Sequence, residues 1–196
     1  MKKFRLAVLL SGRGSNFEAI ADAVEAGRIP GAEIVAVISD VEQAPGLARA
    51  RQRRLPAWAV DRRQIRSRLA REQEILRILS DAKPDLVCLA GYMRLLSPEF
   101  VARYRGKILN IHPALLPKFP GLEAQRRALE AGEKVSGCTV HVVDEGTDTG
   151  PIVLQKVVPI EPGDTAETLA ARILEKEHEA YPEAIARVLA ELEKRG

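Results

Sequence analysis

The sequence predicts an α/β fold, an open, mostly parallel, Rossmann-like twisted sheet flanked by helices. Apolar runs of strand length alternate with stretches of helical periodicity, which is typical of successive β-α-β units. Residues 85–90 are almost continuously apolar, as expected of a central parallel strand covered on both faces. In the C-terminal half, two strand-like segments follow each other without a helix between them, so we expect the sheet to turn antiparallel there.

Composition favours one domain and a small-molecule function. The chain has 196 residues, 46% of them hydrophobic, which is enough to bury a single core. A net charge of +3 permits an anionic substrate but does not indicate the concentrated basic face of a nucleic-acid-binding protein. The cysteines, Cys88 and Cys138, lie far apart, so we expect no zinc site, no disulfide and a cytoplasmic location. The start, Met1-Lys2-Lys3, resembles the n-region of a signal peptide, but Arg5 follows at once and the apolar run 6–10 is too short for an h-region. No stretch is long enough to cross a membrane.

A glycine-rich loop joins the first strand, residues 4–10, to the first helix. It reads Ser11-Gly12-Arg13-Gly14-Ser15-Asn16, and apolar residues recur at helical spacing from Phe17 onward. Glycines let the backbone approach a ligand, Ser15 or Asn16 is expected to cap the helix, and the amides of the first turn attract an anion. A phosphate site and a plain capped turn both fit this loop.

The same loop partly matches the dinucleotide-binding fingerprint. Gly12 and Gly14 correspond to its first two glycines, and Asp40 follows the next strand, roughly where a ribose-binding acid would lie. Phe17 takes the place of the third glycine and is too large for close packing beside a pyrophosphate. A single phosphate group is therefore the better fit.

The middle of the chain continues the alternation of strands and helices. Strands are expected over 34–39 and 57–60, with a helix over 45–53 between them. A longer helix ends near Asp81, and its apolar side is predicted to contain Ile65, Leu69, Ile75, Leu76 and Leu79. Nine arginines between Arg49 and Arg71 indicate solvated helix faces rather than a nucleic-acid surface, because stacking aromatics are nearly absent.

A second candidate binding surface follows the central strand. The segment Gly91-Tyr92-Met93-Arg94-Leu95-Leu96 offers a flat apolar wall and exposed backbone groups. It suits either a heterocyclic ligand or a loop packed on the core. Ser97 is then expected to cap a short helix that has Pro98 at its first position.

Residues 107–111 read as a buried strand that ends in polar side chains. Asn110 and His112, two residues apart, point to the same side at its carboxyl end. In open parallel sheets this edge is where ligands bind. A proline-rich loop, residues 113–121, follows and shapes the expected cleft.

The remaining elements are a helix over 123–131, strands over 137–143 and 152–160, and a final helix. An acidic loop, residues 144–150, joins the two strands and is longer than a simple hairpin needs. Asp164 or Thr165 is expected to cap the final helix, and Pro182 to interrupt or kink it.

One set of polar residues suits acyl transfer. Asn110 can donate to a developing oxyanion, His112 can donate or shuttle a proton, and Asp148 can orient the imidazole and stabilise its charged form. The other histidines, His141 and His178, lie in a strand and on a charged helical face, so structural roles are expected for both. A metal site is disfavoured because no second ligand stands at a fixed short spacing.

These residues resemble the folate-dependent formyltransferase family. The resemblance is carried by Asn110-Ile111-His112-Pro113 with Leu115-Leu116-Pro117, and by Asp148-Thr149-Gly150-Pro151 before a strand. It covers essentially the whole chain and implies a one-carbon transferase with 10-formyltetrahydrofolate as co-substrate and no metal. The opening glycine loop is similar to that of the members that formylate glycinamide ribonucleotide in purine biosynthesis.

The resemblance also implies roles for individual residues. Asn110, His112 and Asp148 match the catalytic residues, Gly14, Ser15 and Asn16 match the phosphate site, and Glu177 matches a contact to the ribose hydroxyls. The positions that match the folate site are Arg68 at the glutamate tail, the wall Met93, Arg94, Leu95 and Leu96, Asn110, and the loop that begins at Asp144 and borders the pteridine. Thr139 stands where relatives carry a small hydroxyl residue, and Lys118 is a further candidate contact to the anionic substrate.

The chain departs from the family pattern at Glu123-Ala124-Gln125, which replaces a segment that often carries histidines. The domain is expected to span 1–196, with a phosphate-binding half over 1–100 and a catalytic and folate-binding half over 101–196. Small-molecule partners, and either a monomer or a homodimer, are expected. The extra domains of methionyl-tRNA formyltransferase and formyltetrahydrofolate hydrolase are not expected in 196 residues.

The implied reaction is direct attack of the substrate amine on the formyl carbon. His112 then acts as an electrostatic group or also as the base, and the sequence leaves both roles open. The alternatives are formyltetrahydrofolate hydrolase activity, which needs no acceptor, and a non-catalytic phosphosugar- or nucleotide-binding module, which would leave Asn110, His112 and Asp148 without a purpose.

Overall fold

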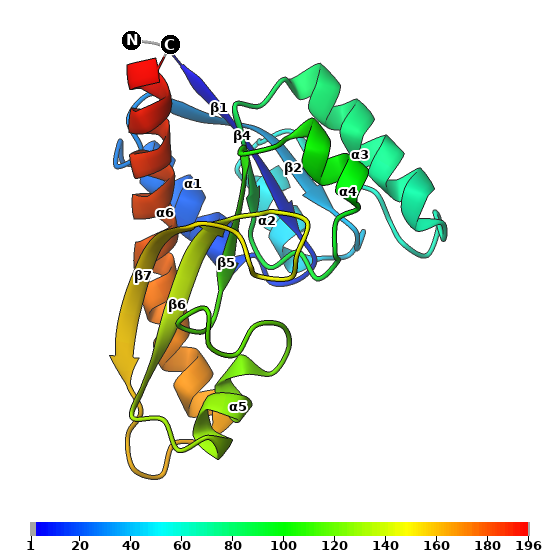
Figure 1. The fold of residues 1–196 in the computed structure, drawn as a ribbon. Helices are drawn as coiled ribbons and strands as arrows, with labels where there is room; N and C mark the ends of the chain where they lie inside the picture. The colour runs from blue at the N-terminus through cyan, green and yellow to red at the C-terminus, as the bar shows by residue number, and fades with distance from the viewer. Residues whose placement is uncertain (1–2, 196) are drawn as a thin grey trace.

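Seven strands and six helices occur in residues 3–195, the part of the chain that the computed structural model describes (Figure 1). The strands are β1 (Phe4–Leu10), β2 (Ala32–Ser39), β3 (Ala57–Ala59), β4 (Leu86–Leu89), β5 (Ile108–His112), β6 (Val135–Val142) and β7 (Ile152–Pro159). The helices are α1 (Ser15–Glu25), α2 (Pro45–Gln52), α3 (Arg68–Ala82), α4 (Pro98–Arg103), α5 (Ala124–Glu130) and α6 (Ala166–Arg195). Every predicted element is present, with ends shifted by a few residues.

The strands form one sheet in the order β3-β2-β1-β4-β5-β6-β7. The pairs from β3 to β5 are parallel, whereas β6 pairs antiparallel with both β5 and β7. The fold class predicted from the sequence, including the antiparallel turn, is therefore confirmed. Successive strands run outward from β1 to β3 on one side and from β4 on the other, so the order reverses between β1 and β4. In such sheets a crevice opens at the carboxyl ends of the strands where the order reverses.

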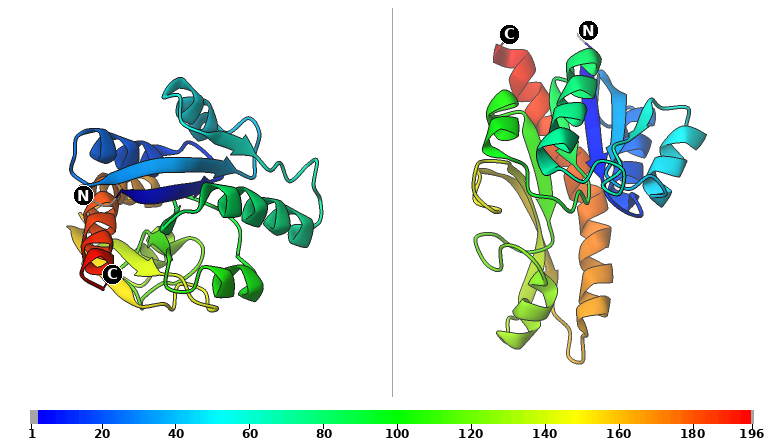
Figure 2. Two further views of the ribbon diagram at one scale, coloured as in Figure 1. Left: turned by 90° about the horizontal axis from the view of Figure 1, so that it is seen from above. Right: turned by 90° about the vertical axis from the view of Figure 1, so that its right-hand side faces the viewer.

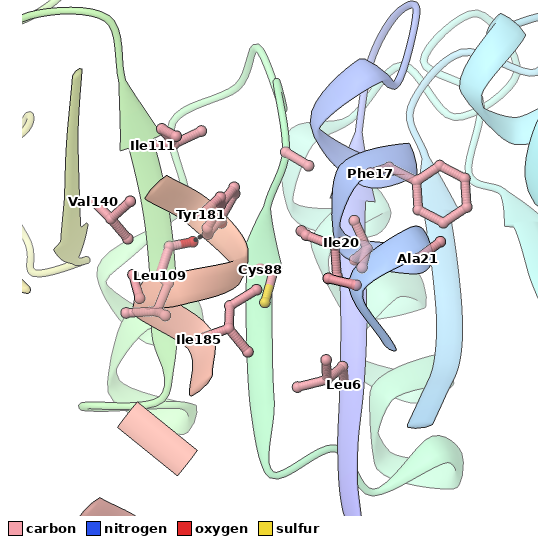
Figure 3. Close-up of a cluster of buried hydrophobic side chains, with 14 of the residues drawn as sticks. Leu6, Phe17, Ile20, Ala21, Cys88, Leu109, Ile111, Val140, Tyr181 and Ile185 are labelled. Carbon is pink, nitrogen blue, oxygen red and sulfur yellow. Dashed lines mark hydrogen bonds between the residues drawn. The ribbon is translucent and has the colours of Figure 1, made fainter. Parts of the chain in front are cut away.

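Helices cover both faces of the sheet, with α1, α2 and α6 on one face and α3 and α4 on the other (Figures 1 and 2). The larger core lies under α1 and α6, where Phe17, Ile20 and Ile185 are fully buried (Figure 3). The buried Tyr181 of α6 donates its hydroxyl to the carbonyl oxygens of Leu89 at 3.0 Å and Leu109 at 2.9 Å. This contact fixes α6 against the last residue of β4 and the second residue of β5.

The start of α1 differs from the prediction. The N-cap residue is Gly14, with φ of 77°, and no side chain accepts from the first turn, so the expectation that Ser15 or Asn16 caps this helix is wrong. The reason is close packing of the backbone. A Cβ at Gly14 would lie 2.6 Å from the Cα of Gly46, so the loop can meet the start of α2 only with glycine there. The first-turn amides of α1 are left without a side-chain cap.

Other helix ends follow the sequence signals. The hydroxyl of Ser97 accepts from the N–H of Phe100 at 3.2 Å, with Pro98 at the first helical position, as predicted. Thr165, one of the two predicted caps of α6, accepts from the N–H of Thr168 at 3.3 Å. These caps satisfy amides that have no intrahelical partner.

Two predictions about the helices need correction. The helix α6 is 30 residues long and is not interrupted at Pro182. Tyr181 and Ile185, on either side of this proline, are buried in the core and hold the helix together there. Leu69, predicted on the apolar side of α3, is 60% exposed, since it lies in the first turn while Ile75 and Leu79 carry the contact with the sheet. Among residues 3–195, no helix is both long enough and apolar enough to span a membrane.

Candidate functional site

Asn110, His112 and Asp148 meet at the carboxyl end of β5, as the sequence led us to expect. Asn110 and His112 come from the strand itself, and Asp148 comes from the β6–β7 connection, which arches back toward β5 (Figure 1). The Nδ1 of His112 lies 3.2 Å from Oδ2 of Asp148, and Nδ2 of Asn110 donates to Oδ1 of Asp148 at 3.4 Å. The three side chains therefore form one hydrogen-bonded cluster.

The loop that carries Asp148 is closed against β6 by a glycine. A Cβ at Gly150 would lie 1.8 Å from the carbonyl oxygen of Val142, so no other residue fits there without a shift of the backbone. The N–H of Val142 also donates to the carbonyl oxygen of Pro151 at 2.9 Å. These contacts direct the loop back over the end of β5.

Asp148 is surrounded by donors. Besides Asn110 and His112, it accepts from the backbone N–H of Gly121 at 2.8 Å, and Nε2 of His141 lies 3.4 Å from Oδ1. Burial alone raises the pKa of this carboxyl, but the hydrogen bonds from His141 and Gly121 and the nearby charges of His112 and His141 outweigh burial and lower the pKa to about 2. The carboxylate therefore stays ionised at neutral pH.

Both ring nitrogens of the buried His112 face acceptors. Nδ1 points at Asp148, and Nε2 lies 2.9 Å from the carbonyl oxygen of Phe119. A carbonyl oxygen can only accept, so Nε2–H is the donor in the contact with Phe119. The imidazole is thus held between a carboxylate and a backbone carbonyl.

His141 belongs to this cluster, and the structural role expected for it from the sequence is incomplete. In the antiparallel pairing of β5 with β6, His141 stands directly opposite Asn110, and partners across a ladder share one face of the sheet. Its Nδ1 lies 3.2 Å from the carbonyl oxygen of Val142, and its Nε2 lies 3.2 Å from Nδ2 of Asn110. Placing His141 here from the sequence would have required the register between β5 and β6.

Thr139 holds the proline-rich loop. Its hydroxyl donates to the carbonyl oxygen of Ala114 at 2.6 Å and accepts from the N–H of Leu116 at 3.0 Å. The amide of Gln155 donates to the same hydroxyl and to the carbonyl oxygen of Leu116, each at 2.9 Å. This small hydroxyl residue therefore fixes the chain that leaves His112.

The predicted phosphate site lies between β1 and α1, at the carboxyl end of a strand that β4 separates from β5. Nδ2 of Asn16 donates to Oε2 of Glu177 at 2.7 Å, which brings together two residues that are 161 positions apart in the sequence. Burial raises the pKa of Glu177, and the hydrogen bond from Asn16 opposes that rise. The Oδ1 of Asn16 is buried without a hydrogen-bond partner among residues 3–195. The uncapped first-turn amides of α1 are the donors that this site offers to an anion, whereas the free Oδ1 of Asn16 can only accept a hydrogen bond.

The predicted wall, residues 91–96, follows β4 and is joined to the glycine loop. The N–H of Ser11 donates to the carbonyl oxygen of Gly91 at 3.0 Å, and the N–H of Met93 donates to the hydroxyl of Ser11 at 2.9 Å. Met93 is 65% exposed and Leu95 67% exposed, so the wall presents apolar side chains to solvent. Leu96 is partly buried against the core on the α3 face.

Three other predicted residues have partners elsewhere. Arg68, at the start of α3, donates from Nε to Glu72 at 3.1 Å. Asp144 accepts from the N–H of Gly146 and the hydroxyl of Thr149, so its carboxylate shapes its own loop. Lys118 bonds Glu133 at 2.7 Å, and the structure does not bring it to the phosphate loop in the described residues.

This chain is similar to known proteins over most of its length. The formyl transferase family matches residues 4–185 of this chain. The phosphoribosylglycinamide formyltransferase of Haemophilus influenzae is 47% identical over 182 residues, which cover 93% of this chain and 84% of that protein. The solved structure of glycinamide ribonucleotide transformylase 1 from Symbiobacterium toebii superimposes with a TM-score of 0.90 at 51% identity, covering 94% of this chain and 86% of that one.

A similar segment occurs inside longer proteins. The trifunctional purine biosynthetic protein adenosine-3 of Drosophila pseudoobscura pseudoobscura is 51% identical over 183 residues, which cover 93% of this chain but only 13% of that relative's length. The family match nevertheless extends over all seven strands of the sheet and the three strand ends described above. The chain belongs to the formyl transferase family.

Proposed function

We propose that this chain transfers the formyl group of 10-formyltetrahydrofolate to the amine of glycinamide ribonucleotide, in purine biosynthesis. The products are formylglycinamide ribonucleotide and tetrahydrofolate. The observation that carries the proposal is the meeting of Asn110, His112 and Asp148 at the sheet edge that also carries the glycine loop after β1 and the apolar wall after β4. The similarity to phosphoribosylglycinamide formyltransferase supports the same acceptor.

The amine attacks the formyl carbon directly. Its lone pair forms the new C–N bond while the carbonyl π pair moves onto oxygen, and the collapse of this intermediate breaks the bond to N10 of the folate. The amide of Asn110 and a ring N–H of His112 donate to the oxyanion. The net proton movement is from the amine to N10, and His112 is the group placed to relay it.

Asp148 acts through its charge. A carboxyl whose pKa is about 2 is a weak base at neutral pH, so its part is to orient His112 and keep the ring protonated. The carboxylate does not take the amine proton itself.

The two substrates approach from opposite sides of this cluster. The phosphate of the ribonucleotide binds the first-turn amides of α1 at Gly14, Ser15 and Asn16, and the carboxylate of Glu177 accepts from the ribose hydroxyls. The folate lies against Met93 and Leu95, with its pteridine bordered by residues 144–148. All partners in this scheme are small molecules, and the two buried free cysteines fit a reducing cytoplasm.

The test is to incubate the chain with both substrates and to follow tetrahydrofolate release with and without glycinamide ribonucleotide. Acceptor-dependent release supports the proposal. Release that needs no acceptor indicates hydrolase activity instead, and ribonucleotide binding without any release indicates a non-catalytic module.

Asn110→Ala provides the matched variant for this assay. Losing one oxyanion donor costs about a hundredfold or more in turnover, and the residue is only partly buried, so folding should survive. Circular dichroism and thermal unfolding verify the fold, and steady-state kinetics measures kcat. Near-normal turnover by the folded variant would contradict the role of Asn110.

A further inference from the structure

Two buried carboxylates lie behind the apolar wall and take no part in the proposed chemistry. Asp40, at the end of β2, is 0% exposed, and Glu72, on α3, is 5% exposed. A carboxylate removed from water needs compensating charges and donors. Each of these two acids has a partner in the wall or at its end.

Asp40 holds the middle of the wall. Its Oδ2 accepts from Nε of Arg94 at 3.1 Å, and Arg94 stands between the exposed side chains of Met93 and Leu95. Arg62 approaches the same oxygen at 3.6 Å, but it belongs to the segment after β3 and not to the wall. Fixing the side chain of Arg94 restricts the backbone that presents both apolar residues.

Glu72 contacts both the end of the wall and Arg68, the residue predicted to face the glutamate tail of the folate. Its Oε1 accepts from the backbone N–H of Ser97 at 3.0 Å and from Nε of Arg68 at 3.1 Å. The terminal NH₂ groups of Arg68 make no hydrogen bond or ion pair among residues 3–195. The guanidinium is therefore held on one side, and its other donors remain available to a ligand carboxylate.

We propose that Asp40 and Glu72 are positioning residues that preorganise the folate site, Asp40 by fixing Arg94 within the wall and Glu72 by aligning Arg68 with the residue that ends the wall. The inference rests on the proposed function, since it assigns the wall to formyl-folate. Its physical basis is preorganisation. Groups already held in the bound geometry lose less conformational freedom when the ligand arrives.

Tyr92 lies in the same wall and packs against the core on the α3 face. Burial raises the pKa of its hydroxyl, and the charges of Asp40 and Glu72 raise it further. The contacts of Arg94 and Ser97 thus anchor the middle and the end of one partly buried segment.

The experiment compares Asp40→Asn and Glu72→Gln with two controls in the full chain. Arg62→Gln removes the ion partner of Asp40 that lies outside the wall, and Glu74→Gln removes a partly exposed acid of α3 that pairs with Arg77. Steady-state assays measure kcat and the separate KM values for 10-formyltetrahydrofolate and glycinamide ribonucleotide. Thermal unfolding reports the stability of every variant.

We expect each positioning variant to lower kcat/KM for the folate about tenfold, the usual scale of one charge-assisted hydrogen bond. In both positioning variants, the KM for the ribonucleotide should stay within about twofold of that of the unmodified chain. Both controls should keep their kinetic constants within the same limit, because the contacts that they remove lie outside the wall. For Glu72→Gln, the preference for 10-formyltetrahydrofolate over 10-formyltetrahydropteroate, which lacks the glutamate tail, should also fall about tenfold.

Two outcomes overturn the inference. In one, both variants keep kcat/KM for the folate within twofold. In the other, the KM values for both substrates rise together, as general structural damage would produce. If Asp40→Asn fails to fold, the partly exposed Arg94→Gln breaks the same contact from the ligand side, and an unchanged KM for the folate in that variant refutes the role of Asp40. Failure of the proposed function is recognised separately, because the unmodified chain then shows no acceptor-dependent transfer.

Discussion

At the scale of single residues, Asp148 is the centre of the site because donors surround its carboxylate. Asn110, His112, His141 and the backbone of Gly121 all point at this one group. A negative charge held this way orients the groups around it and in turn depends on them. The same contacts make the residue important for stability as well as for chemistry.

The stabilising effect of Asp148 should depend on pH. Its pKa in the folded chain lies below its ordinary value of 3.8, at about 2, so the ionised group stabilises the fold above pH 3.8 and this effect is lost as pH falls through 2. Asp148→Asn should lower the free energy of unfolding by on the order of 2 kcal/mol near neutral pH, with little difference from the parent at about pH 2.

Urea unfolding of parent and variant across this pH range measures that effect. A difference in unfolding free energy that stays constant from neutral to acidic pH would contradict the assignment, because it would mean that the lost contacts are independent of charge.

His141 gives a second prediction at this scale. His141→Gln removes the ring that lies opposite Asn110 and beside Asp148, so we expect turnover to fall about tenfold, roughly one hydrogen bond to a charged group. His178→Gln is the matched control and should change kcat less than about twofold, since no hydrogen bond or ion pair joins His178 to Asn110, His112 or Asp148 in the described part of the chain. Equal turnover in the two variants would show that His141 only packs.

The sequence alone predicted Asn110, His112 and Asp148 because their types and places are visible locally, as polar residues at a strand end and in an acidic loop. It did not predict the place of His141. That place depends on which residue of β6 lies opposite Asn110, and a shift of one residue would turn the ring to the other face. Nothing in the alternation of His141 with its valine neighbours specifies this register.

At the scale of elements, the glycine loop before α1 is the most constrained connection. Gly14 has a positive φ and touches Gly46, so two independent restraints act on one residue. Gly27, after the same helix, has a similar φ of 70°, but a Cβ added there would meet no atom within 4 Å. Comparing Gly14 with Gly27 therefore separates the effect of a positive φ from the effect of close packing against Gly46.

We expect Gly14→Ala to lower the free energy of unfolding by about 2–4 kcal/mol, and Gly27→Ala by about 1 kcal/mol, the cost of the left-handed conformation alone. Gly14→Ala should also raise the KM for the ribonucleotide. Thermal unfolding and kinetics check both effects, and equal destabilisation by the two variants would contradict the packing argument.

Helix boundaries were predictable where a side chain makes the cap, as Ser97 and Thr165 do. They were not predictable where backbone packing decides. The cap at Gly14 depends on Gly46, a residue on another helix, and the continuity of α6 through Pro182 depends on core contacts of the neighbouring Tyr181. Local preferences yield to tertiary contacts at such positions.

At the scale of the whole molecule, the strand order brings three separate loops to one edge. The carboxyl ends of β1, β4 and β5 are adjacent because these strands are parallel neighbours. The alternation of strands and helices predicted a parallel sheet, and the edge where ligands bind could be inferred from it. The distances between the loops could not be predicted from the sequence, since they depend on how the helices pack.

Reactivity of the cysteines should report on the whole fold. Cys88 on β4 and Cys138 on β6 are fully buried in the same core, and burial raises the pKa of both thiols, that of Cys138 to about 12. A thiol reagent should therefore label both cysteines at one common rate, set by global unfolding. Mass spectrometry of labelled peptides tests this, and faster labelling of either cysteine would indicate local opening of its strand.

The contact between His112 and the carbonyl of Phe119 has a consequence for selectivity between the substrate and the intermediate. A neutral formyl oxygen that reaches Nε2 only replaces one carbonyl acceptor with another, so the exchange gains little free energy. An oxygen that has acquired full negative charge is the stronger acceptor and displaces Phe119 with a net gain. Under the proposed function, the carbonyl oxygen of Phe119 competes with the substrate oxygen for Nε2–H of His112. The substrate oxygen becomes the better acceptor only as the reaction gives it negative charge.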